Sequence, residues 1–176
     1  MPCNCTCRLK FPFVLKAVLL GALVLALGSL FWMRQSGSQG VGNRPHFAQS
    51  TLVITGAGGA RNKFFVEVAN SKEEQAYGLM FLRALDEDKG MVFPYHPPRE
   101  VAFWMENTLI PLDMLFVRPD GTIGRIVAEA KPQDMTPIPS QVPVIAVIEI
   151  GGGVAKKKGI AVGDKVEMEG ILGTSR

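Results

Sequence analysis

Residues able to do chemistry gather between Phe103 and Asp113, where the chain reads FWMENTLIPLD. This short segment combines an indole, an amide, a hydroxyl and a carboxylate, from Trp104, Asn107, Thr108 and Asp113. A buried polar group without a hydrogen-bond partner costs roughly a few kcal/mol, so a strand that only fills a core seldom carries this mixture. We therefore expect the segment to form part of a site, or of a polar network that fixes a turn.

The guanidinium of Arg83 could complete a ligand site with this segment. Its fork can bind a carboxylate or a phosphate at two points, Asn107 and Thr108 can orient a ligand, and Trp104 can stack on a sugar or another flat surface. A structural network is the alternative, in which Arg83 pairs with Asp113 while the amide and the hydroxyl hold a turn. Both interpretations stay open, and the candidate ligand-binding residues are Arg83, Trp104, Asn107, Thr108 and Asp113.

Sequence support for catalysis is thin. The region after residue 45 has no cysteine, no serine in a nucleophile-elbow motif, no H-E-x-x-H pattern and no phosphate-binding loop. Glu106 and Asp113 could act as acid and base on a glycoside, but their spacing does not set the distance between the two carboxyl groups. An envelope carbohydrate-active hydrolase is thus an alternative, a non-catalytic module is favoured, and no cofactor is expected.

Four methionines and a histidine suggest a soft-metal site. Thioether and imidazole groups bind copper, which an exported domain can meet. The spacing, however, lacks the close Met-x-Met clustering of a dedicated copper site, and methionine commonly fills gaps in cores. We expect core packing and no metal for Met80, Met91, Met105 and Met114, with His96 nearby in sequence.

The N-terminus has the pattern of a signal anchor or a signal peptide. Basic residues precede 17 uncharged residues, 17–33, and a polar Gly/Ser-rich stretch follows. With snorkelling at Lys16 this is just enough to cross a hydrocarbon core of about 30 Å. Positive charge before the run keeps the N-terminus in the cytosol, which places the following domain in the periplasm or outside the cell. We favour an uncleaved inner-membrane anchor, whereas cleavage after Gly28 would release a secreted protein.

The chain is expected to have four parts. These are a cytosolic tail at 1–10, the anchor or signal at 11–33, a flexible linker at 34–49 and a folded domain at 50–172. The tail holds Cys3, Cys5 and Cys7, which could be acylated, could bind a soft metal or could be idle thiols. Because the domain has no cysteine, its core must hold it together without a disulfide.

Charge argues against a nucleic-acid partner. The net charge of +3 arises at the N-terminus, because five of the 19 basic residues and none of the 16 acidic residues precede position 45. The remaining 14 basic residues against 16 acidic ones form no basic stripe. We expect a membrane contact through the N-terminal helix, and a small molecule, a glycan or an envelope protein as partner.

Short strands must position the candidate residues. Alternating or continuous apolar runs predict strands at 52–55, 64–69, 91–93, 101–105, 113–117, 122–130 and 144–150, with a last one after Asp164. The run 144–150 is expected to be buried on both faces except at Glu149, and the proline-rich 94–98 to be irregular. Ser71 and Glu74 form a capping-box pattern for a short helix that ends at Gly78.

The sequence also allows one helical turn around Ala155. Many short strands between Gly and Pro turns, with one clear helix, predict a mainly β domain, compact and sandwich-like or barrel-like. With the anchor in front of it, we expect a ligand-binding or accessory module of the cell envelope. A structural partner in an envelope complex is the further alternative.

Six linked motifs together resemble the bacterial and archaeal family known as domain of unknown function 192. They are Gly78-Leu79-Met80 with Arg83, Gly90-Met91 with Phe93, Phe103-Trp104-Met105 with Asn107-Thr108, Pro111-Leu112-Asp113, Asp120-Gly121, and Gly159-Ile160 with Gly163-Asp164. The resemblance covers roughly residues 50 to 170, and the chain departs from the pattern at Glu106, where a basic residue is usual. It implies a compact β-sandwich-like fold, often exported, and supplies no activity.

Overall fold

The computed structural model describes residues 44–168. The predicted cytosolic tail and the predicted anchor lie outside these residues, and the described part contains no helix long and apolar enough to span a bilayer. Residues 44–49, which the sequence places in the linker, are packed onto the domain. Phe47 is only 2% exposed, and the Arg44 guanidinium pairs with the Glu67 carboxylate.

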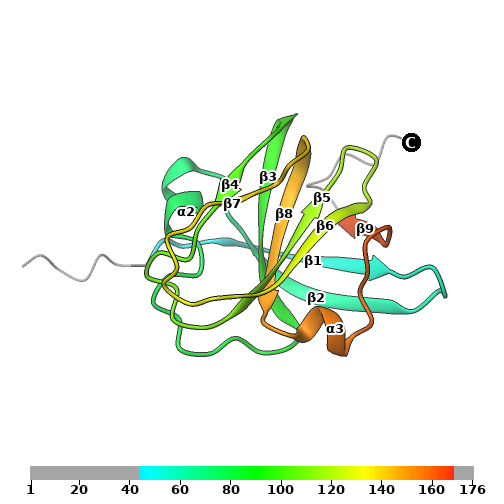
Figure 1. Ribbon diagram of the computed structural model, residues 1–176, viewed down its shortest axis with the longest axis horizontal. Coiled ribbons are helices and arrows are strands. Elements are labelled where there is room, and N and C mark those ends of the chain that lie inside the picture. The colour runs from blue at the N-terminus through cyan, green and yellow to red at the C-terminus, as the bar shows by residue number, and fades with distance from the viewer. Residues whose placement is uncertain (1–43, 169–176) are drawn as a thin grey trace, which may run out of the picture. The chain divides into compact units, whose positions relative to one another are not determined.

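Seven strands form one twisted sheet in the order β6-β5-β8-β3-β2-β1-β9, and a separate ribbon joins β4 to β7. Figure 1 shows β1 and β2 running across the direction of β3, β8 and β5, so the sheet curls. The strands of the sheet are β1 (Ala48–Thr55), β2 (Arg61–Val68), β3 (Lys89–Arg99), β5 (Leu112–Val117), β6 (Ile123–Ala130), β8 (Val144–Gly151) and β9 (Lys165–Met168). The ribbon consists of β4 (Ala102–Phe103) and β7 (Ile138–Pro139), and the described helices are α2 (Lys72–Tyr77) and α3 (Val154–Lys157).

The mainly β prediction is confirmed, with two differences in architecture. One curled sheet takes the place of the two stacked sheets of a sandwich, and it is not a closed barrel, because its edges meet at an isolated bridge between Thr122 and Lys165 and not along a ladder. The described part has two short helices, because the predicted turn near Ala155 is the helix α3. The first helix begins after Ser71, whose side chain forms the predicted capping box with Glu74, and it ends at Gly78.

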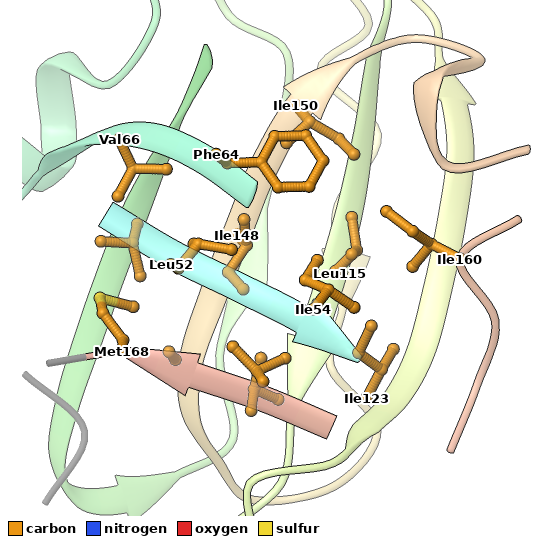
Figure 2. Close-up of a cluster of buried hydrophobic side chains, with 14 of the residues drawn as sticks. Leu52, Ile54, Phe64, Val66, Leu115, Ile123, Ile148, Ile150, Ile160 and Met168 are labelled. Atoms are coloured by element: carbon orange, nitrogen blue, oxygen red, sulfur yellow. The ribbon is translucent and has the colours of Figure 1, made fainter. Parts of the chain in front are cut away.

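Two hydrophobic cores lie on opposite faces of the three strands β3, β8 and β5. The curled sheet encloses the first core, in which Leu52, Phe64 and Ile148 come from different strands (Figure 2). The second core lies on the outer face of these strands and includes Phe93 and Phe116. Because both faces are covered, all six residues of β5 are buried, as is usual for strands between two layers.

One prediction about the central strands is confirmed in part and another is wrong. β3 continues past the proline at 94 to Arg99, but the register with β8 shifts between Pro94 and Arg99, so residues 95–98 of the predicted irregular segment have no partner on β8. Glu149, expected to be the exposed position of β8, is only 5% exposed. Its burial follows from the layer of helix, ribbon and loops that covers this face of the sheet.

Candidate functional site

A pocket of about 230 Å³ lies on the outer side of the sheet, next to the second core. One wall is the end of α2 with the turn after it, residues 75–80, and another is residues 102–104 of β4 and the following loop. Figure 1 shows α2 and the β4–β7 ribbon on the same side of the domain. Phe93 of β3 and Glu149 of β8 line the pocket from the sheet, and Glu106 and Thr108 complete its lining.

Aromatic rings form much of the pocket. The Phe103 ring meets the Phe93 ring edge-on, with centroids 5.0 Å apart and planes at 87°, an arrangement that aromatic pairs favour. The Phe103 ring also meets the Phe116 ring edge-on, with the two centroids 6.4 Å apart. Trp104 lies at the surface with 49% of its area exposed, while Tyr77 contributes from α2. The pocket therefore offers an apolar, aromatic wall with an exposed indole at its edge.

A tight turn at residues 105–108 places the pocket residues Glu106 and Thr108. Asn107 has a left-handed backbone (φ 52°), and its carbonyl accepts a hydrogen bond from the Phe81 N–H at 2.9 Å. The Thr108 hydroxyl donates to the Glu106 carbonyl at 3.2 Å, and the Thr108 carbonyl accepts from the Gln133 N–H at 3.1 Å. The Thr108 hydroxyl thus holds the turn as one interpretation of the sequence proposed, whereas Asn107 contributes through its backbone carbonyl and its side-chain amide only approaches the Met80 sulfur, at 3.9 Å.

Asp113 is a buried structural carboxylate. One of its oxygens accepts the N–H groups of Glu129 (2.8 Å) and Gly153 (2.9 Å), and the other accepts the Ala155 N–H (2.8 Å). It therefore joins β6 to the start of α3, which has no side-chain cap of its own. In the register of β5 with β8, Asp113 lies opposite Ile150, on the other face of the sheet from the pocket.

Arg83 is exposed and lies outside the pocket lining. Within residues 44–168 it makes no hydrogen bond or ion pair, and the Asp113 carboxylate is occupied by backbone N–H groups instead. Of the five candidate residues, the structure brings Trp104 and Thr108 together in the pocket and puts Asn107 in the adjoining turn. It separates Arg83 and Asp113 from them.

Glu149 is the pocket residue that sequence reasoning missed. Its neighbours across the ladder are Met91 on β3 and Met114 on β5, so its carboxyl group lies among apolar side chains. It makes no hydrogen bond within the described residues, and burial alone raises its pKa to about 8. The one sequence signal was its position as the sole charged residue in the apolar run 144–150.

Three of the four methionines pack in the core, as expected from the sequence. Met91, Met105 and Met114 are each at most 1% exposed and belong to the second core, while Met80 lines the pocket. Among residues 44–168, no three His, Cys, Asp or Glu side chains lie close enough to hold a metal ion.

Comparison with known proteins assigns this domain to a family that is described as uncharacterised. The chain belongs to the DUF192 family, described as "Uncharacterized ACR, COG1430", whose pattern matches residues 53–168. No curated protein matches the chain.

Two solved structures are similar in sequence and in fold. A protein of Sinorhizobium meliloti 1021, provisionally described as a transcription regulator, is 36% identical with a TM-score of 0.71; the match covers 73% of this chain and 100% of that one. A protein of unknown function from Novosphingobium aromaticivorans DSM 12444 is 41% identical with a TM-score of 0.66, over 75% and 99% of the two chains. Because the match spans essentially the whole of both relatives, the domain constitutes a complete folding unit in them.

Proposed function

We propose that this domain is a ligand-binding module of the cell envelope, with the pocket beside Trp104 as its site and residues 11–33 as its membrane tether. The observation that carries the proposal is Glu149, a carboxyl group buried in the pocket wall without a hydrogen-bond partner in the described domain. Such a group is costly unless something satisfies it, so its place beside an aromatic pocket favours a ligand that supplies the partner.

The pocket volume bounds the ligand. Pockets for drug-sized ligands typically have about 300–1,000 Å³, and this one has about 230 Å³. The ligand is therefore a small molecule, or one end of a larger molecule whose remainder stays in solvent. The exposed Trp104 indole at the edge could stack on that remainder, as it would on a sugar ring.

The test is a ligand screen on the chain from Arg44 onward, with thermal shift and intrinsic fluorescence as readouts. Trp104 is the sole tryptophan of this part of the sequence, so its emission reports on the pocket edge. Ala102→Phe should block the pocket, because Ala102 is an exposed lining residue. Ala128→Phe is the matched control, since Ala128 is exposed on β6 away from the pocket. Ligands that shift both variants equally would refute the assignment of the site.

The membrane part of the proposal has its own test. Full-length protein should sediment with membranes and resist extraction by salt and alkali, whereas the chain from Arg44 onward should stay in the supernatant. Recovery of the full-length protein in the soluble fraction would contradict the tether. The provisional description of the Sinorhizobium relative as a transcription regulator does not transfer readily, because the 14 basic and 16 acidic residues from position 45 onward leave no excess of positive charge for nucleic acid.

A carbohydrate-active hydrolase is the second candidate, and one observation favours it. Glu106 and Glu149 line the same pocket, and the pKa of Glu149, raised to about 8 by burial, keeps that carboxyl protonated at neutral pH as a general acid requires. Asp113 is a poor partner for Glu106 because three backbone N–H groups already occupy it. Turnover of an envelope glycan that is lost in folded Glu149→Gln would establish the enzyme over the binding module.

A further inference from the structure

The charge of the pocket indicates the class of its ligand. Glu106 and Glu149 are the charged side chains of its lining, which contains no lysine, arginine or histidine. Arg83, the residue that would have attracted a carboxylate or a phosphate, is not part of the lining. An anion entering this pocket would lose its hydration without gaining a cationic partner, and above pH 8, where Glu149 is ionised, it would also meet like charge.

The walls suit a positively charged ligand. Tyr77, Phe93, Phe103 and Trp104 contribute aromatic rings to the lining, and a cation over the face of such a ring gains about 0.5–2 kcal/mol. Glu149 supplies an anion when ionised, and no donor from the described domain competes for its oxygens. A buried carboxylate without a partner beside several aromatic rings is the arrangement that recognises ammonium groups.

We propose that the pocket selects a small organic cation, an ammonium group with apolar substituents. This inference rests on the proposed binding function. The nitrogen pairs with the Glu149 carboxylate, and the substituents pack on Phe93, Phe103 and Trp104. Glu106 adds negative charge to the pocket lining and assists the approach of the cation without being buried itself.

This arrangement makes binding depend on pH. Glu149 must lose its proton to pair with the cation, and burial holds its pKa at about 8. The other titratable groups near it are Tyr77 from α2, Glu106 from the turn and Tyr95 from β3, whose pKa burial raises to about 12, with Arg99 acting against that rise. The facing residue of β5 is the apolar Met114. The ionised fraction of Glu149 rises from about one tenth at pH 7 to about nine tenths at pH 9, so affinity for a permanent cation should rise about tenfold.

Three probes of one shape separate the alternatives: choline, its neutral carbon isostere 3,3-dimethylbutan-1-ol, and the anion 3,3-dimethylbutanoate. Each is titrated into the chain from Arg44 onward and followed by Trp104 fluorescence and calorimetry at pH 7 and pH 9. Choline should bind at least tenfold more tightly than the alcohol at pH 9, with the tenfold pH dependence, and the anion should not bind. Choline binding at pH 7 should also release a proton, seen as a dependence of the binding heat on the buffer.

Two variants localise the effect. Glu149→Gln should abolish both the preference for choline over the alcohol and the pH dependence, whereas Glu100→Gln, at an exposed position outside the pocket, should change neither. Equal or tighter binding of the alcohol, or a choline affinity that Glu149→Gln leaves unchanged, would overturn the cation inference while leaving the binding module intact. Failure of all three probes would also overturn it, and the broader ligand screen would then decide the proposed function separately.

Discussion

Replacing Glu149 by glutamine should stabilise the domain, and the gain should grow with pH. In the unfolded chain the carboxyl ionises above its ordinary pKa of 4.5, whereas burial holds the folded-state pKa at about 8. The folded state therefore binds one more proton than the unfolded state between these values. Stability consequently falls as pH rises from 4.5 to about 8 and then levels off. Glutamine has nearly the same shape and cannot ionise, so it removes this loss.

The size of the effect follows from the shift. One pKa unit corresponds to about 1.4 kcal/mol, so the full shift costs the wild-type domain about 5 kcal/mol at pH 9 and about 3 kcal/mol at pH 7. Below pH 4.5 wild type and Glu149→Gln should have nearly equal stability, because both carry a neutral side chain there. Glu67 does not disturb this window. The hydrogen bond from Arg44 lowers the pKa of Glu67. The stability that Glu67 contributes is therefore lost only at acidic pH, as pH falls through the ordinary pKa of a glutamate toward the lowered one.

The measurement is urea unfolding of the chain from Arg44 onward at pH 4.5, 7 and 9, followed by Trp104 fluorescence. Subtracting the free energies of unfolding of wild type and variant cancels the titration of groups that both share. Glu100→Gln serves as the control and should track wild type at every pH. The argument that this carboxyl is buried without a partner would be refuted by either of two results. The free energies of unfolding of wild type and Glu149→Gln could differ by the same amount at every pH, or the variant could be less stable at pH 9.

Three further substitutions test the parts that hold the pocket in place, each by urea unfolding. Asp113→Asn should cost about 2–4 kcal/mol, because an amide must turn its NH₂ toward a backbone N–H such as that of Ala155; an unchanged midpoint would contradict the structural role of this carboxylate. Gly90→Ala should cost about 3 kcal/mol or more, since its Cβ would lie 2.4 Å from the Glu149 carbonyl oxygen, and wild-type stability would show that β3 and β8 can separate there. Ser71→Ala should cost about 1 kcal/mol through the lost cap of α2, and no loss at all would mean that the helix is held by packing alone.

Local signals in the sequence predicted the elements that depend on local chemistry. The capping box at Ser71 defines where α2 begins, and the Asp120-Gly121 turn joins β5 to β6, because such signals act over a few residues. The β4–β7 ribbon could not be found in this way. β7 consists of two residues inside a proline-rich loop, and its pairing with Ala102 and Phe103 depends on a contact distant in sequence.

The sequence predicted the candidate site only in part, because the site too depends on contacts between residues that are distant in sequence. The segment from Phe103 to Asp113 was recognisable by its mixture of residue types, yet period-2 alternation on β5 puts Asp113 on the face of the sheet opposite to Glu149. No local pattern shows which buried carboxylate will have partners, because the donors to Asp113 come from residues 16 to 42 positions away.

The contrast between these two carboxylates is the strongest argument for a ligand. Asp113 and Glu149 lie on adjacent strands, each buried, on opposite faces of one sheet. The fold supplies three backbone N–H groups to the first and no hydrogen bond from the described residues to the second. Since an unpaired buried carboxyl lowers stability at neutral pH, and apolar residues of similar size would fit between Met91 and Met114, packing alone does not account for Glu149. Under the proposed function, a ligand in the pocket that Glu149 lines would supply its partner.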